Sequence, residues 1–94
     1  METMKNRVAV VTGAASGIGK ALSLAFAAEG SSVVLADVED EALAAAKAEV
    51  EALGVTALAV KTDVTEEESV ADLCSATLEA FGEVHILCNN AGVG

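Results

Sequence analysis

The sequence predicts an α/β protein in which helices cover both faces of a parallel sheet. Short apolar runs rich in β-branched residues, of which Val8 to Val11 is the first, alternate with longer segments whose apolar residues recur at helical spacing. Of the 94 residues, 53% are hydrophobic but only 2% are aromatic, so the core must be aliphatic. This composition and this alternation favour α/β layering over a β-sandwich or a disulfide scaffold.

The first strand is followed by a glycine turn and a helix, at residues 8–11 and 17–29. Gly13 allows the chain to turn sharply off the strand, Gly17 lets the backbone approach a pyrophosphate, and Gly19 lets the helix pack closely on the sheet. The spacing is G-x-x-x-G-x-G, not the commoner G-x-G-x-x-G. Taken alone, the turn fits a nucleotide site and a plain strand-to-helix connection equally well.

Three further strands and two further helices complete the alternation. Ser16 is expected to cap the first helix, and Thr65 with Glu68 to form a capping box that opens the third. Right-handed crossovers then give a doubly wound, Rossmann-type sheet of order 3-2-1-4, with the first two helices on one face and the third on the other. The expected strands are residues 32–36, 55–61 and 84–88, and the expected helices are residues 39–53 and the segment between Thr65 and Gly82.

The distinctive residues of the chain follow the strands, at the edge of the sheet where ligands bind in such folds. They are Thr12-Gly13, Asp37, Asp63-Val64 and the run from Asn89 to Gly92. The ligand crevice is expected between the first and fourth strands, where the strand order reverses.

Asp37 ends the second strand, about 20 residues beyond the glycine turn, where such sheets place a ribose-binding acid. Its carboxylate can accept both hydroxyl hydrogens of an adenosine ribose, and it would repel a 2′-phosphate. None of Ala15, Ser16 and Val38 is a basic residue that would offset this repulsion. The sequence therefore favours NAD over NADP. The alternative is a strand-end acid that merely begins a turn.

Two other strand ends carry weaker signals. After the third strand, Asp63 can meet the exocyclic amine of an adenine and Val64 its apolar face, although Asp is also an ordinary turn residue. After the fourth, the two amides of Asn89 and Asn90 precede small residues, which suits a tight backbone that admits a ribose closely. An ordinary Asn-rich turn remains the alternative there.

Charge and cysteine content exclude several classes of function. A formal net charge of −10 makes nucleic acid and anionic membranes unsuitable partners. Cys74 and Cys88 are too few for a disulfide framework or a metal site, and we expect buried free thiols. His85 has no partner in sequence and is expected to be structural. Residues 1–7 do not form a signal peptide, so a cytoplasmic location is expected.

Together the four motifs resemble the short-chain dehydrogenase/reductase family, over the whole chain. The resemblance implies NAD binding, with the pyrophosphate over residues 16–19, the adenosine ribose on Asp37, the adenine near Asp63 and Val64, and the second ribose near residues 90–92. The residues expected to bind the cofactor are Gly13, Ala15, Ser16, Gly17, Ile18, Gly19, Asp37, Val38, Asp63, Val64, Asn89, Asn90, Ala91 and Gly92.

The chain departs from the family pattern in what it lacks. Family members are considerably longer, and their catalytic Ser and Tyr-x-x-x-Lys come later in the chain, whereas this sequence has no Tyr. We therefore expect no catalytic residue here. Residues 1–94 are expected to be the NAD-binding part of an alcohol or carbonyl oxidoreductase, whose substrate belongs to the full-length parent.

The predicted sheet also leaves the outer edge of its fourth strand unpaired and one face partly bare. We accordingly expect a fragment or truncated product that associates with itself, through this edge, or with its missing half. The rival hypothesis is a complete, non-catalytic NAD-binding module that acts as a sensor or partner subunit. A third, structural reading without any nucleotide would require all four motifs to be coincidences.

Overall fold

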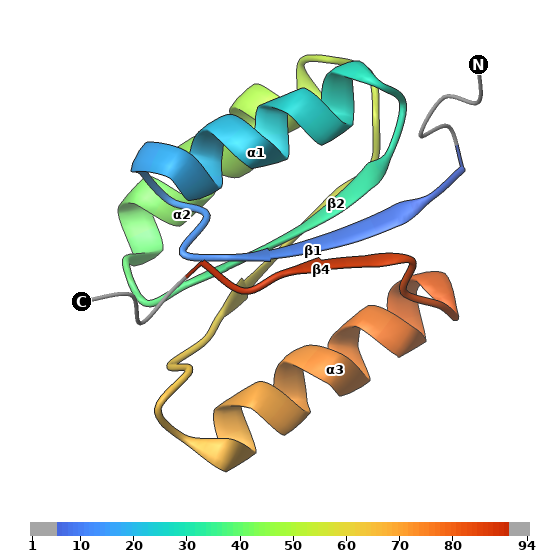
Figure 1. Ribbon diagram of the computed structural model, residues 1–94. Coiled ribbons are helices and arrows are strands. Elements are labelled where there is room, and N and C mark those ends of the chain that lie inside the picture. Colours follow the sequence, from blue (N-terminus) through green and yellow to red (C-terminus); the bar gives the residue numbers. More distant parts are fainter. Residues whose placement is uncertain (1–5, 91–94) are drawn as a thin grey trace.

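The computed structural model describes residues 6–90 and contains four strands and three helices in strict alternation (Figure 1). Each element lies within a few residues of its predicted position. The elements are β1 (Val8–Thr12), α1 (Gly17–Ala28), β2 (Ser32–Asp37), α2 (Asp40–Glu51), β3 (Ala57–Lys61), α3 (Glu67–Phe81) and β4 (Ile86–Cys88).

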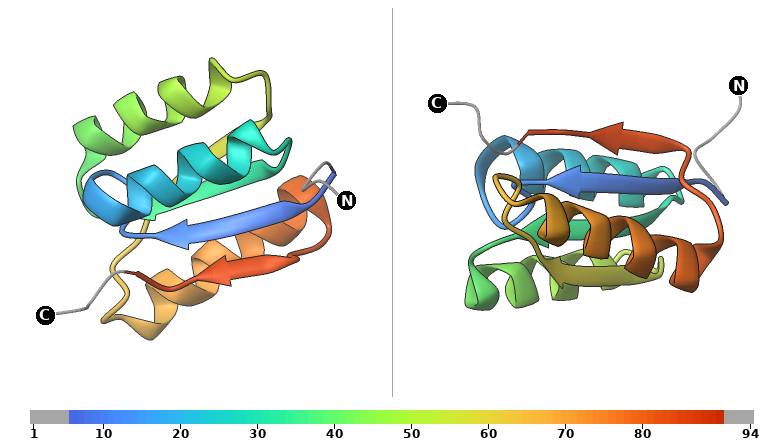
Figure 2. Two further views of the ribbon diagram at one scale, coloured as in Figure 1. Left: turned by 45° about the horizontal axis from the view of Figure 1, so that its top comes forward. Right: turned by 90° about the horizontal axis from the view of Figure 1, so that it is seen from below.

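The strands form one parallel sheet of order β3-β2-β1-β4, which confirms the predicted Rossmann-type topology. In the register of the sheet, Val10 of β1 lies between Val34 of β2 and Leu87 of β4. β1 pairs with β2 along five residues but with β4 along only three. Figure 2 shows β4 at the edge of the sheet, beside β1.

The helices cover the two faces unequally. α1 packs on β1 and β2, and α2 packs on β2 and β3, so both lie on one face, while α3 lies alone on the other (Figure 1). Alternate residues of each strand point to opposite faces. Val11, Val33 and Leu35 therefore join the core under α1 and α2, whereas Val10 and Val34 pack against α3.

The predicted helix caps are only partly correct. Ser16 occupies the position before α1 in an extended conformation, but its side chain makes no capping hydrogen bond. The predicted capping box of α3 is wrong, because the residue before α3 is Glu66 and the Thr65 hydroxyl donates instead to Asp63 Oδ1 at 2.6 Å. α3 thus begins one residue later than the pattern requires, and the Thr65 hydroxyl closes a local turn with Asp63.

Neither cysteine is buried, contrary to the prediction. Both are free thiols as expected, but Cys74 on α3 is exposed and Cys88 on β4 is only half-buried. The reason is that α3 is the one helix on its face among the described residues. Within residues 6–90, none of the helices combines the length and the apolar character that crossing a bilayer demands.

Candidate functional site

The glycine turn between β1 and α1 lies at the carboxyl edge of the sheet, as predicted. Gly17 has a φ of +58°, which a residue with a side chain rarely adopts, and a Cβ there would meet nothing within 4 Å. A Cβ on Gly19, in contrast, would lie 2.0 Å from the carbonyl oxygen of Gly13 and 3.1 Å from Asn90 Nδ2. The turn therefore needs Gly17 for its conformation and Gly19 for close approach, and the space above Gly17 is open.

The N-terminus of α1 differs from those of the other helices in its charge. The first turn of α1 contains no acidic residue, whereas α2 begins with Asp40 and Glu41 and α3 with Glu67 and Glu68. The first backbone N–H groups of a helix have no intrahelical partner and carry a partial positive charge. In α1 no acidic side chain of the first turn balances this charge, so it can attract an external anion. Residues 16–18 are exposed to solvent.

Asp37 lies beside this turn and is held by backbone N–H groups. Its Oδ2 accepts a hydrogen bond from the N–H of Ala15 at 2.9 Å. Its Oδ1 accepts from Val38 at 2.7 Å and from Glu39 at 3.3 Å. Asp37 thus begins a turn, as in the alternative interpretation, and its contact with a ribose stays a prediction. The side chain of Val38 is 47% exposed.

Asp63 organises the loop between β3 and α3. Its Oδ1 accepts from the hydroxyl and from the backbone N–H of Thr65, and its own N–H donates to Ser69 Oγ at 2.8 Å. The hydroxyl bond first, and the N–H bond second, hold the pKa of Asp63 below its ordinary value of 3.8. Val64 is half-buried at the same edge.

Thr12, which was not among the residues expected to bind the cofactor, joins β1 to the segment after β4. Its hydroxyl donates to Asn89 Oδ1 at 3.0 Å and accepts the N–H of Asn90 at 2.8 Å. Asn89 and Asn90 are therefore brought to the glycine turn as predicted, while Ala91 and Gly92 lie outside the described residues. The signal in the sequence was a hydroxyl residue at a strand end beside the switch point of the sheet.

His85 has the structural role that we expected. Its Nδ1 accepts the backbone N–H of Val8 at 3.0 Å, and its Nε2 lies 3.2 Å from Glu83 Oε1. These bonds are at the amino end of β1, at the opposite edge from the glycine turn. Among residues 6–90, no group of three or more His, Cys, Asp or Glu side chains is arranged to hold a metal ion.

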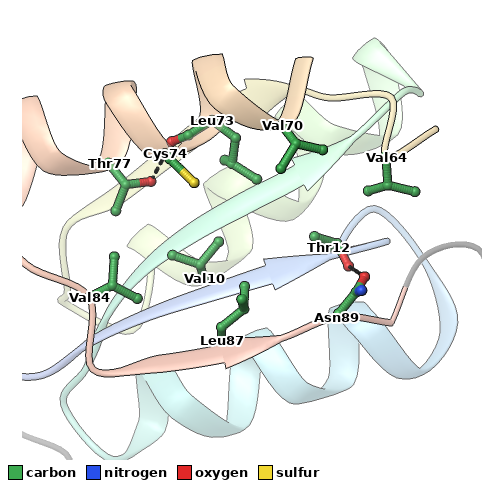
Figure 3. A pocket seen from close by; sticks show the side chains of 10 residues that line it. All are labelled: Val10, Thr12, Val64, Val70, Leu73, Cys74, Thr77, Val84, Leu87 and Asn89. Carbon is green, nitrogen blue, oxygen red and sulfur yellow. Dashed lines mark hydrogen bonds between the residues drawn. The ribbon is translucent and has the colours of Figure 1, made fainter. Parts of the chain in front are cut away.

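A cavity of about 340 Å³ lies between α3 and the sheet (Figure 3). Thr12 and Asn89, joined by their hydrogen bond, supply its polar side chains near the carboxyl edge, and none of the glycines of the turn lines it. The remainder is largely apolar. Its lining residues are Val10, Thr12, Val64, Val70, Leu73, Cys74, Thr77, Val84, Leu87 and Asn89.

This arrangement is suited to a dinucleotide. A positive helix end, an exposed glycine backbone and a carboxylate lie on one sheet edge, and they match a pyrophosphate and a ribose diol. Asn90 and the apolar cavity lie next to these groups, on the β4 side of β1.

Comparison with known proteins agrees with this fold. The sequence model of the family described as short chain dehydrogenase matches residues 7–94. The 1-deoxy-11-beta-hydroxypentalenate dehydrogenase of Streptomyces exfoliatus is 48% identical over 90 residues, which are 96% of this chain and 33% of that protein.

Two solved structures share the fold closely. A short chain dehydrogenase/reductase from Burkholderia phymatum in complex with NAD has a TM-score of 0.88 and 44% identity, over 93% of this chain and 31% of that one. L-Sorbose reductase from Gluconobacter frateurii, complexed with NADPH and L-sorbose, has a TM-score of 0.94 and 38% identity, over 99% of this chain and 36% of that one.

The chain thus spans about a third of the length of these relatives. The family match covers all but the first six residues of the chain, including the glycine turn and the three other strand-end motifs. The chain belongs to the short-chain dehydrogenase/reductase family.

Proposed function

We propose that this chain binds NAD and is the dinucleotide-binding part of an NAD-dependent alcohol or carbonyl oxidoreductase. The observation that carries the proposal is the acid-free, glycine-bounded N-terminus of α1 with Asp37 beside it. The pyrophosphate would lie over residues 16–19, the adenosine ribose on Asp37 and the adenine near Asp63 and Val64. Relatives with this fold bind NAD in one case and NADPH in another, so the fold alone leaves the choice of cofactor open.

The preference for NAD rests on Asp37 and its surroundings. A 2′-phosphate on the ribose would meet the Asp37 carboxylate, and the exposed Val38 beside it brings no positive charge. The Ala15 amide faces Asp37 and is already bonded to it at 2.9 Å. Repulsion between the two anions should therefore penalise NADP more than NAD.

The nicotinamide, when bound, supplies the hydride chemistry, and the residues described here hold the cofactor but do not move the alcohol proton. We place the second ribose near Asn90, Ala91 and Gly92. We assign residues 1–94 to the cofactor-binding part, and place the proton-transferring groups and the substrate pocket in a longer parent. The chain alone should show no turnover. We also propose a reducing compartment such as the cytoplasm, which the two free thiols support.

The alternative is a non-catalytic NAD-binding module that acts as a sensor or partner subunit. Such a module would have to cover the β4 edge and the cavity. We propose that it does so by self-association through that edge or by association with the rest of the fold. Leu87, 65% exposed at this edge, supports such a contact. Sedimentation separates the possibilities, because the module requires a stable monomer or dimer by itself, whereas a fragment should form a complex with the remaining polypeptide and gain solubility from it.

Titration calorimetry with NAD and NADP tests the cofactor assignment. We expect Asp37→Ala to weaken NAD binding at least about tenfold, because it removes charge-assisted hydrogen bonds, and to narrow the difference between NAD and NADP. Asp40→Ala is the matched control, since it removes an exposed acid paired with Lys61 nearby. Equal NAD affinity in the wild type and Asp37→Ala would make the ribose assignment wrong.

A further inference from the structure

We propose that Asp37 is also a positioning residue, whose carboxylate fixes the glycine turn before any cofactor arrives. This inference rests on the proposed function and deepens it. The contact that carries it is the hydrogen bond from the Ala15 N–H to Asp37 Oδ2, at 2.9 Å between residues 22 positions apart.

Ala15 is the last buried residue before the exposed part of the turn. Its exposure is 6%, whereas Ser16 and Gly17 are exposed to solvent. A buried N–H that loses its partner is costly, since water cannot easily replace the bond. The preceding residue is held separately, because the Ala14 N–H donates to the Ala36 carbonyl oxygen at 3.1 Å. The Asp37 side chain thus extends the attachment of the turn to β2 by one residue, toward Gly17.

The same carboxylate also fixes the start of α2. Oδ1 accepts from Val38 and Glu39, the two residues that precede that helix. One side chain therefore joins the two loops that lead into α1 and α2. Both loops lie at the edge where we place the cofactor, so bonds within the protein itself set their separation.

The number of acceptor sites limits what Asp37 can offer a ribose. A carboxylate has about four lone-pair positions, and three backbone N–H groups already point at this one. A ribose diol needs two, so its second hydroxyl must compete with a backbone donor, and the 3.3 Å bond from Glu39 is the longest of the three. Part of the contribution of Asp37 to binding must then come from holding the turn.

Amide hydrogen exchange of the protein without ligand tests the positioning role directly. In the wild type we expect the Ala15 amide to exchange more slowly than those of Ser16 and Gly17. We expect at least about tenfold faster exchange at Ala15 in Asp37→Ala, since the acceptor is lost. Asp37→Ser keeps a short acceptor for the turn before α2 but cannot reach Ala15, so it should show the same change with α2 intact. Asp40→Ala should leave Ala15 unchanged.

A second measurement separates positioning from ribose binding. ADP and 2′,3′-dideoxy-ADP are titrated into the wild type, Asp37→Ser and Asp40→Ala. The dideoxy compound has no ribose hydroxyls that could donate hydrogen bonds to Asp37. If Asp37 only bound the ribose, the wild type and Asp37→Ser would therefore bind this compound with equal affinity. We expect Asp37→Ser to bind it about threefold to tenfold more weakly than the wild type does.

The two measurements fail separately. Rapid Ala15 exchange in the wild type, unchanged exchange in Asp37→Ser, or equal affinity for dideoxy-ADP would each overturn the positioning role. Absence of ADP and NAD binding by the wild type would overturn the proposed function, and the exchange rates would still decide whether Asp37 holds the turn.

Discussion

The two faces of this sheet differ in how closely their helices approach it. On the face of α1 and α2, even a methyl group on Gly19 would lie 2.0 Å from a backbone oxygen. On the face of α3, a cavity of about 340 Å³ separates the helix from β1 and β4. The closely packed face fixes the glycine turn and Asp37, while the open face borders the Thr12–Asn89 contact. The edge that carries the candidate site is thus closely packed on one side and incompletely covered on the other.

The largest difference between the faces should appear in core substitutions. Leu35 is fully buried under α1 and α2, so Leu35→Ala should lower the free energy of unfolding by about 2–5 kcal/mol. Leu87 is 65% exposed, and Leu87→Ala should change the free energy of unfolding by less than about 0.5 kcal/mol. Urea denaturation of both variants measures the contrast. Similar losses in the two would mean that the β4 face is covered in solution.

Substitution of the two glycines should give a smaller contrast. Gly19→Ala should cost about 1–3 kcal/mol, because the new Cβ meets the Gly13 carbonyl and α1 must move. Gly17→Ala has open space and should cost only about 1 kcal/mol, from its positive φ. Thermal unfolding ranks the two. The opposite ranking would show that α1 is less closely packed than described.

The smallest effect is expected at Asp63, at the loop that enters α3. Its pKa is lowered in the folded state, so the stabilisation from its hydrogen bonds is fully present above the ordinary value of 3.8 and is lost as the pH falls through the lower folded value. Thr65→Ala removes the hydroxyl donor and should raise the pKa of Asp63 toward its ordinary value. Carboxyl titration by NMR tests this, with Thr56→Ala, at an exposed position outside this loop, as the control. No change in the Asp63 titration would contradict it.

The order of strands and the layer of each helix could be predicted because the apolar periods are clean and a glycine follows β1 and each of the three helices. The edges of elements were less predictable. Residues 84–88 were expected to form a strand, but β4 begins at Ile86, because the imidazole of His85 takes the Val8 N–H that a backbone carbonyl would otherwise accept. The Thr65 and Glu68 pattern failed because α3 begins after Glu66, one residue later than that pattern requires, and the Thr65 hydroxyl donates to Asp63.

The gathering of the strand-end residues at one edge of the sheet could be predicted, but their bonds to one another could not. Asp37 was assigned from its position after a strand, which carries no information about the Ala15 amide 22 residues earlier. Thr12 acquires its partners only when the first and fourth strands become neighbours. Such contacts depend on the register between strands, which a linear pattern does not contain.

The strand order has a consequence for the sequence of folding events. β1 is the first strand to be made. Its contacts with the segment after β4 join residues 77 and 78 positions apart, because Thr12 bonds to Asn89 and Asn90. β2 can pair with β1, and β3 with β2, earlier, since less chain must be closed into a loop. The adenosine half of the proposed site should therefore be in place while the half near Asn90 is still unformed. A nascent chain would hold adenine nucleotides before it could hold the whole dinucleotide.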